Sequence, residues 1–321
     1  MRRFLLKAAV FLAIQFALAV WVASSLQTSD PASYMAAFED KTALLARADE
    51  PNRVILVGGS NTAWGLNAVE LGQTLGHPVV NAGLHAALGL RLILDYPAAY
   101  LHRGDLVVLS LEYEHYDEDT KQDAIVWAST PYLKKIPMAV TSLQPVYLSD
   151  HFLQYVATAW DHRVNMRKAA RKTDSDIFAH DSFDARGDFV AHYGLPPPLA
   201  VGDLPFEFAN ANPDFHTAVV ARLNDFIDQA QARGARVVLY FPPLPTEKFA
   251  MYKTQLVALD TALRAELRAP ILNHPGELVL ADADFYNTVY HLTKPGVEKR
   301  NADLAARLRA YLAAPPSAPT K

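Results

Sequence analysis

The stretch Arg53–Asn61 reads Arg-Val-Ile-Leu-Val-Gly-Gly-Ser-Asn, and it decides the fold class. A short run of apolar, mostly β-branched residues that stops at glycines predicts a strand buried on both faces of a sheet. Residues 64–75 then predict the helix that follows this strand. Ser60 therefore stands at a strand-to-helix turn, where its hydroxyl can be presented at the end of a parallel sheet.

The same alternation of apolar strands and helices continues along the chain. Strands are predicted at 53–57, 79–82, 105–111, 236–241 and 271–273, and helices at 64–75, 88–101, 213–233, 247–268 and 295–313. This order predicts an α/β fold with a five-stranded parallel sheet that helices cover on both faces. We expect a single domain over residues 51–313, because α/β folds with insertions often use that length for one unit.

Residues 113–212 interrupt this alternation directly after the third predicted strand, and prolines punctuate them. Loops of this length are usually functional lids or small subdomains. A helix is predicted at 150–172. Its basic segment 162–172 is interpreted either as a solvated helix face or as a surface that grips anionic lipid headgroups or an acidic polysaccharide.

The N-terminus combines positive charge with an apolar run from Ala8 to Leu26. The run is about as long as the roughly 20 residues that a helix needs to cross a bilayer. We expect residues 1–27 to be a single-pass transmembrane anchor in the inner membrane, with the following chain exported under the positive-inside rule. A signal peptide cleaved near Ala23 is the alternative. Residues 28–50 are expected to form a stalk with a helix, and residues 314–321 a disordered tail.

The bulk composition excludes several classes of function. A hydrophobic content of 51% excludes a disordered chain, and a net charge of −4 with a pI of about 6.3 argues against a nucleic-acid partner. The absence of cysteine excludes disulfides, thiol nucleophiles and cysteine-ligated metals. Neither glycine-rich nucleotide motif is present, and the acidic segment 112–119 lacks paired histidines, so no cofactor or metal is expected.

His291 complements Ser60 from the other end of the chain, because it opens the last predicted helix. Ligands of doubly wound sheets bind at the carboxyl ends of the strands, and Ser60, Gly83, Glu112 and the loop of His291 all fall at such ends. A histidine that takes the proton of a serine hydroxyl activates it as a nucleophile. The pair therefore predicts the site of a serine hydrolase or acyltransferase.

These segments resemble the SGNH (GDSL-like) hydrolases and acyltransferases, which have a flavodoxin-like three-layer α/β/α sandwich. Residues 57–61 match the block that carries the nucleophile, residues 81–83 the block that supplies an oxyanion glycine, and residues 285–293 the block that holds the base. The anchor, the long insertion and Gly296 beyond the base are similar to membrane-anchored members that act on cell-envelope polymers. The D-alanyl-lipoteichoic acid biosynthesis protein and the partners of membrane-bound O-acyltransferases are such members.

The resemblance implies a role for each matched residue. Ser60 is expected to be the nucleophile and His291 the general base. The backbone N–H groups of Ser60 and Gly83, helped by the Asn61 side chain, are expected to form the oxyanion hole. His85, two residues after Gly83, is expected to touch substrate.

Two positions depart from the family pattern. The family places an aspartate three residues before the base to orient its ring, but Thr288 stands there, so Asp284, Asp282 or a backbone carbonyl is expected to hold His291. The third block ends its strand with an oxyanion-hole asparagine, whereas this chain has Glu112, which is predicted as a substrate-binding residue. A carboxylate aimed at an oxyanion would repel it, so Glu112 must point elsewhere or be protonated unless the site is not a standard hydrolase.

The first functional hypothesis is an O-acyltransferase that acts outside the inner membrane on an envelope or secreted polysaccharide. A carbohydrate esterase that uses the same Ser60 and His291 with water is the second. The third is a non-catalytic accessory partner of a membrane-bound O-acyltransferase, which the two departures from the family pattern favour. The sequence does not decide among them.

Overall fold

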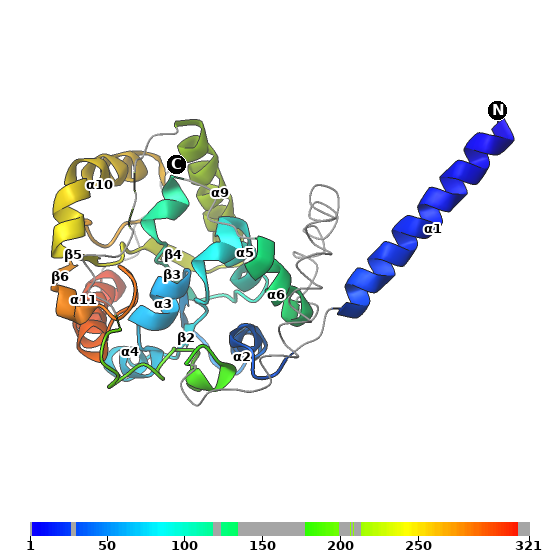
Figure 1. Cartoon of the computed structure of the whole chain (residues 1–321). Helices are drawn as coiled ribbons and strands as arrows, with labels where there is room; N and C mark the ends of the chain where they lie inside the picture. Colours follow the sequence, from blue (N-terminus) through cyan, green and yellow to red (C-terminus); the bar gives the residue numbers. More distant parts are fainter. Residues whose placement is uncertain are drawn as a thin grey trace.

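The computed structural model describes residues 2–26, 30–117, 123–133, 177–198, 206, 208 and 213–313 (Figure 1). Its centre is a parallel sheet formed by β1 (Val54–Val57), β2 (Val79–Asn81), β3 (Leu106–Leu109) and β4 (Arg236–Leu239). The strand order is β2-β1-β3-β4, and β1 pairs with both β2 and β3. The side chains of β1, β2 and β3 are all buried, as expected for a sheet covered on both faces. The predicted parallel α/β sheet is confirmed.

The predicted fifth strand is reduced to one bridge, between Leu239 and Ile271. Leu239 donates to Pro270 O at 2.9 Å, and its carbonyl accepts from Leu272 N at 2.8 Å. Pairing then stops because the side chain of Asn273 bonds both the N–H and the carbonyl of Phe241, at 2.8 and 3.0 Å. Within the described residues the main sheet therefore has four strands and not five, and a separate parallel pair forms from β5 (Leu244–Pro245) and β6 (Val279–Leu280).

Helices lie on both sides of the main sheet (Figure 1). Helices α4 (Ala68–Leu75) and α11 (Lys294–Ala313) pack together, as do α5 (Gly89–Ala98) and α9 (Pro213–Ala232). Helix α10 (Thr246–Glu266) packs on β5 and β6. The expected helices 88–101, 213–233, 247–268 and 295–313 are thus present within a few residues of their predicted ends.

The predicted helix 64–75 is divided into α3 (Ser60–Gly65) and α4. Leu66 has an extended backbone, and the Asn67 side chain accepts a hydrogen bond from Glu70 N at 2.9 Å. Asparagine is a strong N-cap because its oxygen satisfies an N–H group of the first turn. The cap at Asn67 therefore starts a new helix, and the first helix begins earlier than predicted, at Ser60 itself.

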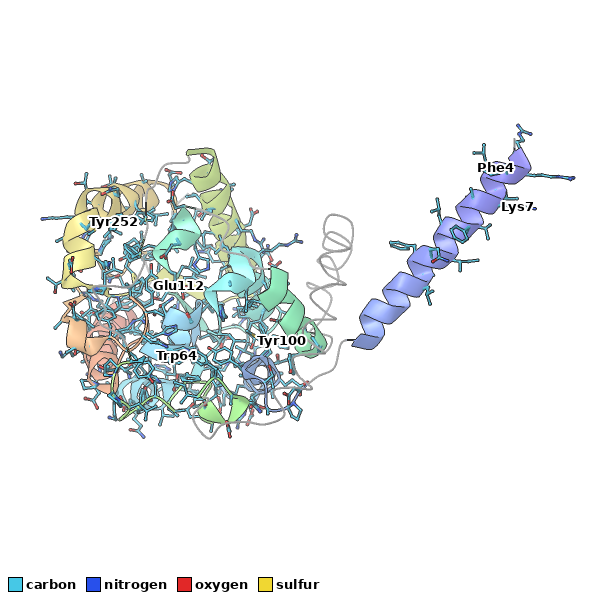
Figure 2. The ribbon with its side chains drawn as sticks, in the orientation of Figure 1. Phe4, Lys7, Trp64, Tyr100, Glu112 and Tyr252 are labelled. Carbon is cyan, nitrogen blue, oxygen red and sulfur yellow. The ribbon has the colours of Figure 1, made fainter. Side chains whose placement is uncertain are left out.

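The N-terminal region contains α1 (Arg2–Leu26), which lies apart from the packed body, with Phe4 and Lys7 pointing away from the helix axis (Figure 2). In the part of the chain that the structure describes, no helix meets the length and apolarity needed to cross a membrane. The predicted anchor stays a prediction. Helix α2 (Ala37–Leu45) lies within the predicted stalk, yet Phe38, Lys41 and Leu45 are buried against the body.

The described parts of the insertion include α6 (Asp123–Leu133) and the segment 177–198. That segment docks at the end of β2, where Arg186 O accepts from Asn81 N at 3.0 Å and Asp188 Oδ1 accepts from Asn81 Nδ2 at 2.7 Å. Lys41 Nζ of α2 donates to the carbonyls of Asn81 and Gly187, at 2.8 and 2.5 Å. Burial lowers the pKa of Lys41 and raises that of Asp188. The predicted helix 150–172, its basic segment and the predicted tail 314–321 lie outside the described residues.

Candidate functional site

Ser60 is the first residue of α3 and follows β1 directly after two glycines. A Cβ on Gly59 would lie 2.5 Å from both carboxylate oxygens of Glu112 and 2.7 Å from Ala86 Cα. A Cβ on Gly58 would collide with the backbone carbonyl of Ser110. The glycines are therefore required because the turn lies against neighbouring chain. The order of strands reverses at β1, which is the point where parallel α/β sheets bind ligands.

Asn61 is held beneath this turn by two buried charged side chains. Glu112 Oε1 accepts from Asn61 N at 2.8 Å, while Arg300 donates to Asn61 O at 2.7 Å and to Asn61 Oδ1 at 2.9 Å. The side-chain nitrogen Nδ2 of Asn61 donates to Ser110 O at 2.9 Å, and the residue is fully buried. The predicted contribution of the Asn61 side chain to an oxyanion hole does not fit this arrangement, because the amide is used inside the core.

Glu112 follows β3, near the strand end where the resemblance predicted an oxyanion-hole asparagine. Its side chain lies in the interior of the body (Figure 2) and is 2% exposed, so the predicted direct contact with substrate does not fit its burial. One oxygen binds Asn61 N, and the other has no hydrogen bond in the described structure, although His115 Nδ1 lies 3.4 Å away. Burial lowers the pKa of Arg300, and the nearby Tyr240 and Glu112 oppose that shift. The negative charge of Glu112 and the positive charge of Arg300 thus partly compensate each other, with Asn61 between them.

His291 lies in the loop before α11 and packs flat on Trp64, with ring centroids 4.3 Å apart and an angle of 10° between the planes. Trp64 is four residues after Ser60 on α3, so the two side chains share one face of the helix, roughly 6 Å apart along its axis. The structure therefore brings His291 to the helix that carries Ser60. No hydrogen bond joins Ser60 Oγ to His291 among the described residues.

The imidazole of His291 is oriented by Asn287. Nδ1 of the ring lies 2.7 Å from Asn287 Oδ1, and the backbone N–H of His291 donates to Thr288 Oγ1 at 2.9 Å. An amide oxygen only accepts, so Nδ1 carries the proton and Nε2 is left as the proton acceptor. The predicted orienting role of Asp284 is not seen, because its two oxygens bind Lys299 Nζ, each at 2.7 Å. Sequence reasoning missed Asn287 because it sought a carboxylate.

Electrostatics keep His291 neutral. Burial lowers its pKa well below the usual range, and the neighbouring His192 and His85 lower it further. A neutral imidazole with a free Nε2 is the form that can accept a proton from a serine hydroxyl. The lowered pKa therefore favours the neutral, proton-accepting form of His291.

The backbone donors expected for an oxyanion hole differ in availability. Gly83 N–H donates to Asn81 Oδ1 at 3.0 Å, and Gly83 packs against Thr62 and Gly59 O. In the described structure no acceptor is placed on the N–H of Ser60. Gly83 thus lies beside the turn, but its N–H is already paired with Asn81.

An aromatic wall, which we define as Tyr34, Trp64, Phe189, His192 and Tyr286, closes one side of the site. Phe189 stacks on Trp64 at 3.7 Å between centroids, and the hydroxyl of Tyr34 accepts from Trp64 Nε1 at 3.2 Å. His192 and Tyr286 contact the same cluster. Phe189 and His192 come from the insertion and Tyr34 from the N-terminal region, a convergence that the sequence alone did not reveal.

Comparison with known proteins gives no further assignment: no family model, no curated protein and no solved structure matches this chain. Within the described residues, no three histidine, aspartate or glutamate side chains gather in a way that could hold a metal ion.

Proposed function

We propose that this chain is an SGNH-like serine O-acyltransferase, with Ser60 as nucleophile, His291 as general base and Asn287 as the group that orients the base. The observation that carries the proposal is the imidazole of His291, fixed by Asn287 and stacked on Trp64 one helical turn from Ser60. The strand order β2-β1-β3-β4 is that of a flavodoxin-like sheet, and Ser60 follows the strand at its switch point.

The chemistry uses an ester as acyl donor. As Ser60 Oγ attacks the carbonyl carbon, its proton passes to His291 Nε2 and the carbonyl π electrons move to the oxygen. The tetrahedral intermediate collapses, the bond to the alcohol breaks, and that alcohol takes the proton from His291. A hydroxyl of the acceptor then gives its proton to His291 and attacks the acyl-serine carbonyl. The bond from the acyl carbon to Ser60 Oγ breaks, and Ser60 Oγ takes the proton back from His291.

The buried aromatic residues beside the helix of Ser60 support transfer to a polysaccharide hydroxyl over hydrolysis. Trp64, Phe189 and Tyr286 are buried around the helix of Ser60, and a site that excludes water lets an acceptor alcohol compete for the acyl-serine. An envelope or secreted polymer as acceptor, an inner-membrane location with the domain outside, and cooperation with a membrane-bound O-acyltransferase belong to the same proposal. They rest on the apolar N-terminal run and on the resemblance of the motifs.

The test is the release of p-nitrophenol from p-nitrophenyl acetate by the full chain, with and without a free oligosaccharide. We expect Ser60→Ala to abolish release, and acceptor to increase both release and acetylated oligosaccharide. Thr261→Ala, which removes an exposed hydroxyl on α10, is the matched control and should leave the rate unchanged. Release that the oligosaccharide does not alter would favour the esterase.

A non-catalytic accessory partner is the second candidate, and specific observations favour it. The predicted donors Gly83 N–H and Asn61 Nδ2 are both paired, and Ser60 Oγ has no hydrogen bond to His291 in the described structure. This candidate predicts that Ser60→Ala leaves polymer acylation in cells unchanged at normal protein level. Loss of acylation in that variant eliminates it.

A further inference from the structure

The groups expected to form the oxyanion hole supply one available donor in the described structure, and a second is lacking. A carbonyl oxygen that gains negative charge needs preorganised donors, and each one typically contributes 10²–10³ in kcat. Of the three expected groups, Gly83 N–H binds Asn81 and the Asn61 amide binds Ser110. Only Ser60 N–H is without an acceptor in the part of the chain that the structure describes. A further donor must come from another residue beside the turn.

His85 has a donor of the required kind. It precedes the short 3-10 turn 86–88 as its N-cap, and its Nδ1 accepts from Ala87 N at 3.1 Å. Because Nδ1 is used as an acceptor, the proton of the neutral ring is on Nε2. The side chain is partly exposed, and the described residues place no partner on Nε2.

The loop of His85 lies against the nucleophile turn. Ala86 Cα, in the next residue, comes within 2.7 Å of where a Cβ of Gly59 would be, and Gly59 directly precedes Ser60. The loop is fixed because Tyr34 Oη donates to Leu84 O at 2.7 Å, and the ring of His85 meets Tyr34 edge-on at 6.5 Å.

Electrostatic interactions connect His85 with Glu112 and His291. Burial lowers its pKa, and Glu112 opposes that shift. His85 in turn lowers the pKa of His291. The lowered pKa of His85 favours the neutral form of the ring, which donates from Nε2. Neutral imidazole as an electrophilic donor to a carbonyl is known chemistry in enzymes.

We propose that His85 is a catalytic residue whose Nε2–H donates a hydrogen bond to the carbonyl oxygen of the acyl group as that oxygen becomes an oxyanion. This inference rests on the proposed function and gives the site its second donor beside Ser60 N–H. It replaces the general expectation of substrate contact by a defined role in the transition state.

Two substitutions separate this role from the capping role of the same side chain. His85→Asn keeps an oxygen that can accept from Ala87 N, since asparagine is a good N-cap, but its amide is too short to reach the position of Nε2. His85→Gln is a longer amide whose N–H can approach that position. We expect His85→Asn to lower kcat about 100-fold with little change in KM. The kcat of His85→Gln should be about tenfold higher than that of His85→Asn.

The assay is steady-state kinetics of the full chain with p-nitrophenyl acetate, with the thermal midpoint as a check on folding. His77→Asn, at a histidine whose Nδ1 lies 3.1 Å from Asn52 O, is the matched control. A His85→Asn variant with wild-type kcat, or a His85→Gln variant no faster than His85→Asn, overturns the inference. Failure of the proposed function is seen separately, as release by the unsubstituted chain that Ser60→Ala does not abolish.

Discussion

Removal of the Asn287 side chain should slow the reaction without unfolding the protein. Asn287→Ala deletes the acceptor 2.7 Å from His291 Nδ1 and leaves a buried N–H unpaired. A hydrogen bond contributes about 1 kcal/mol net, and an orphaned buried donor costs about 1–3 kcal/mol. The bond strengthens when the ring becomes an imidazolium in the transition state. A loss of about 2–3 kcal/mol in transition-state stabilisation corresponds to a kcat roughly 30- to 150-fold lower.

The assay is kcat for p-nitrophenyl acetate at pH 8 under saturating substrate. Asn287→Asp is the informative companion, because a carboxylate in the same place accepts the same N–H and stabilises the imidazolium. It should keep kcat within about tenfold of the unsubstituted chain and raise the pKa of His291. A folded Asn287→Ala variant with kcat within twofold of wild type, in a preparation whose activity depends on Ser60, would refute the role given to Asn287.

The pKa of His291 is lowered well below its usual range by burial, and the neutral ring is the base, so kcat/KM should stay flat as pH falls from 8 through 6.5 and decline only at lower pH. A pH–rate profile with its acid limb at or above 6.5 contradicts this. Gly59→Ala should destabilise the fold by about 1–3 kcal/mol in urea unfolding, because its Cβ would lie 2.5 Å from the oxygens of Glu112. Gly76→Ala is the control, with open space around the Cβ and only the strain of φ +69°. Arg300→Met should lower the free energy of unfolding by about 3–5 kcal/mol, because it leaves the charge of Glu112 buried and uncompensated. A urea midpoint equal to that of the unsubstituted chain would contradict this.

The sheet was predictable because its strands are short apolar runs that end at glycine or polar residues. Local chemistry explains where the prediction of elements failed. Asn67 is a strong cap in the middle of an apolar helical pattern, so it divides one predicted helix into α3 and α4. Asn273 turns its amide to the backbone of Phe241, which ends the fifth strand after one bridge. Both events depend on a single side chain that competes with the backbone pattern.

The candidate site was predictable only in part, since its geometry depends on tertiary contacts. The positions of Ser60 and His291 at the carboxyl edge of the sheet follow from element order. The stacking of His291 on Trp64 does not, because no spacing rule connects residues so distant in sequence. Glu112 looked like an obstacle to an oxyanion hole until the structure placed its oxygen on Asn61 N. Asn287 was overlooked because an amide can orient an imidazole as a carboxylate does.

The central claim is that Ser60 is a nucleophile activated by His291, and covalent labelling with a fluorophosphonate tests it most directly. The reagent forms a phosphonyl ester with an activated serine, and mass spectrometry of the digested full chain locates the adduct. We predict one adduct per chain on the peptide that contains Ser60, labelling at least 100-fold slower in His291→Ala, and none at that peptide in Ser60→Ala. A wild-type chain that stays unmodified at Ser60, or that reacts equally fast without His291, would contradict the account.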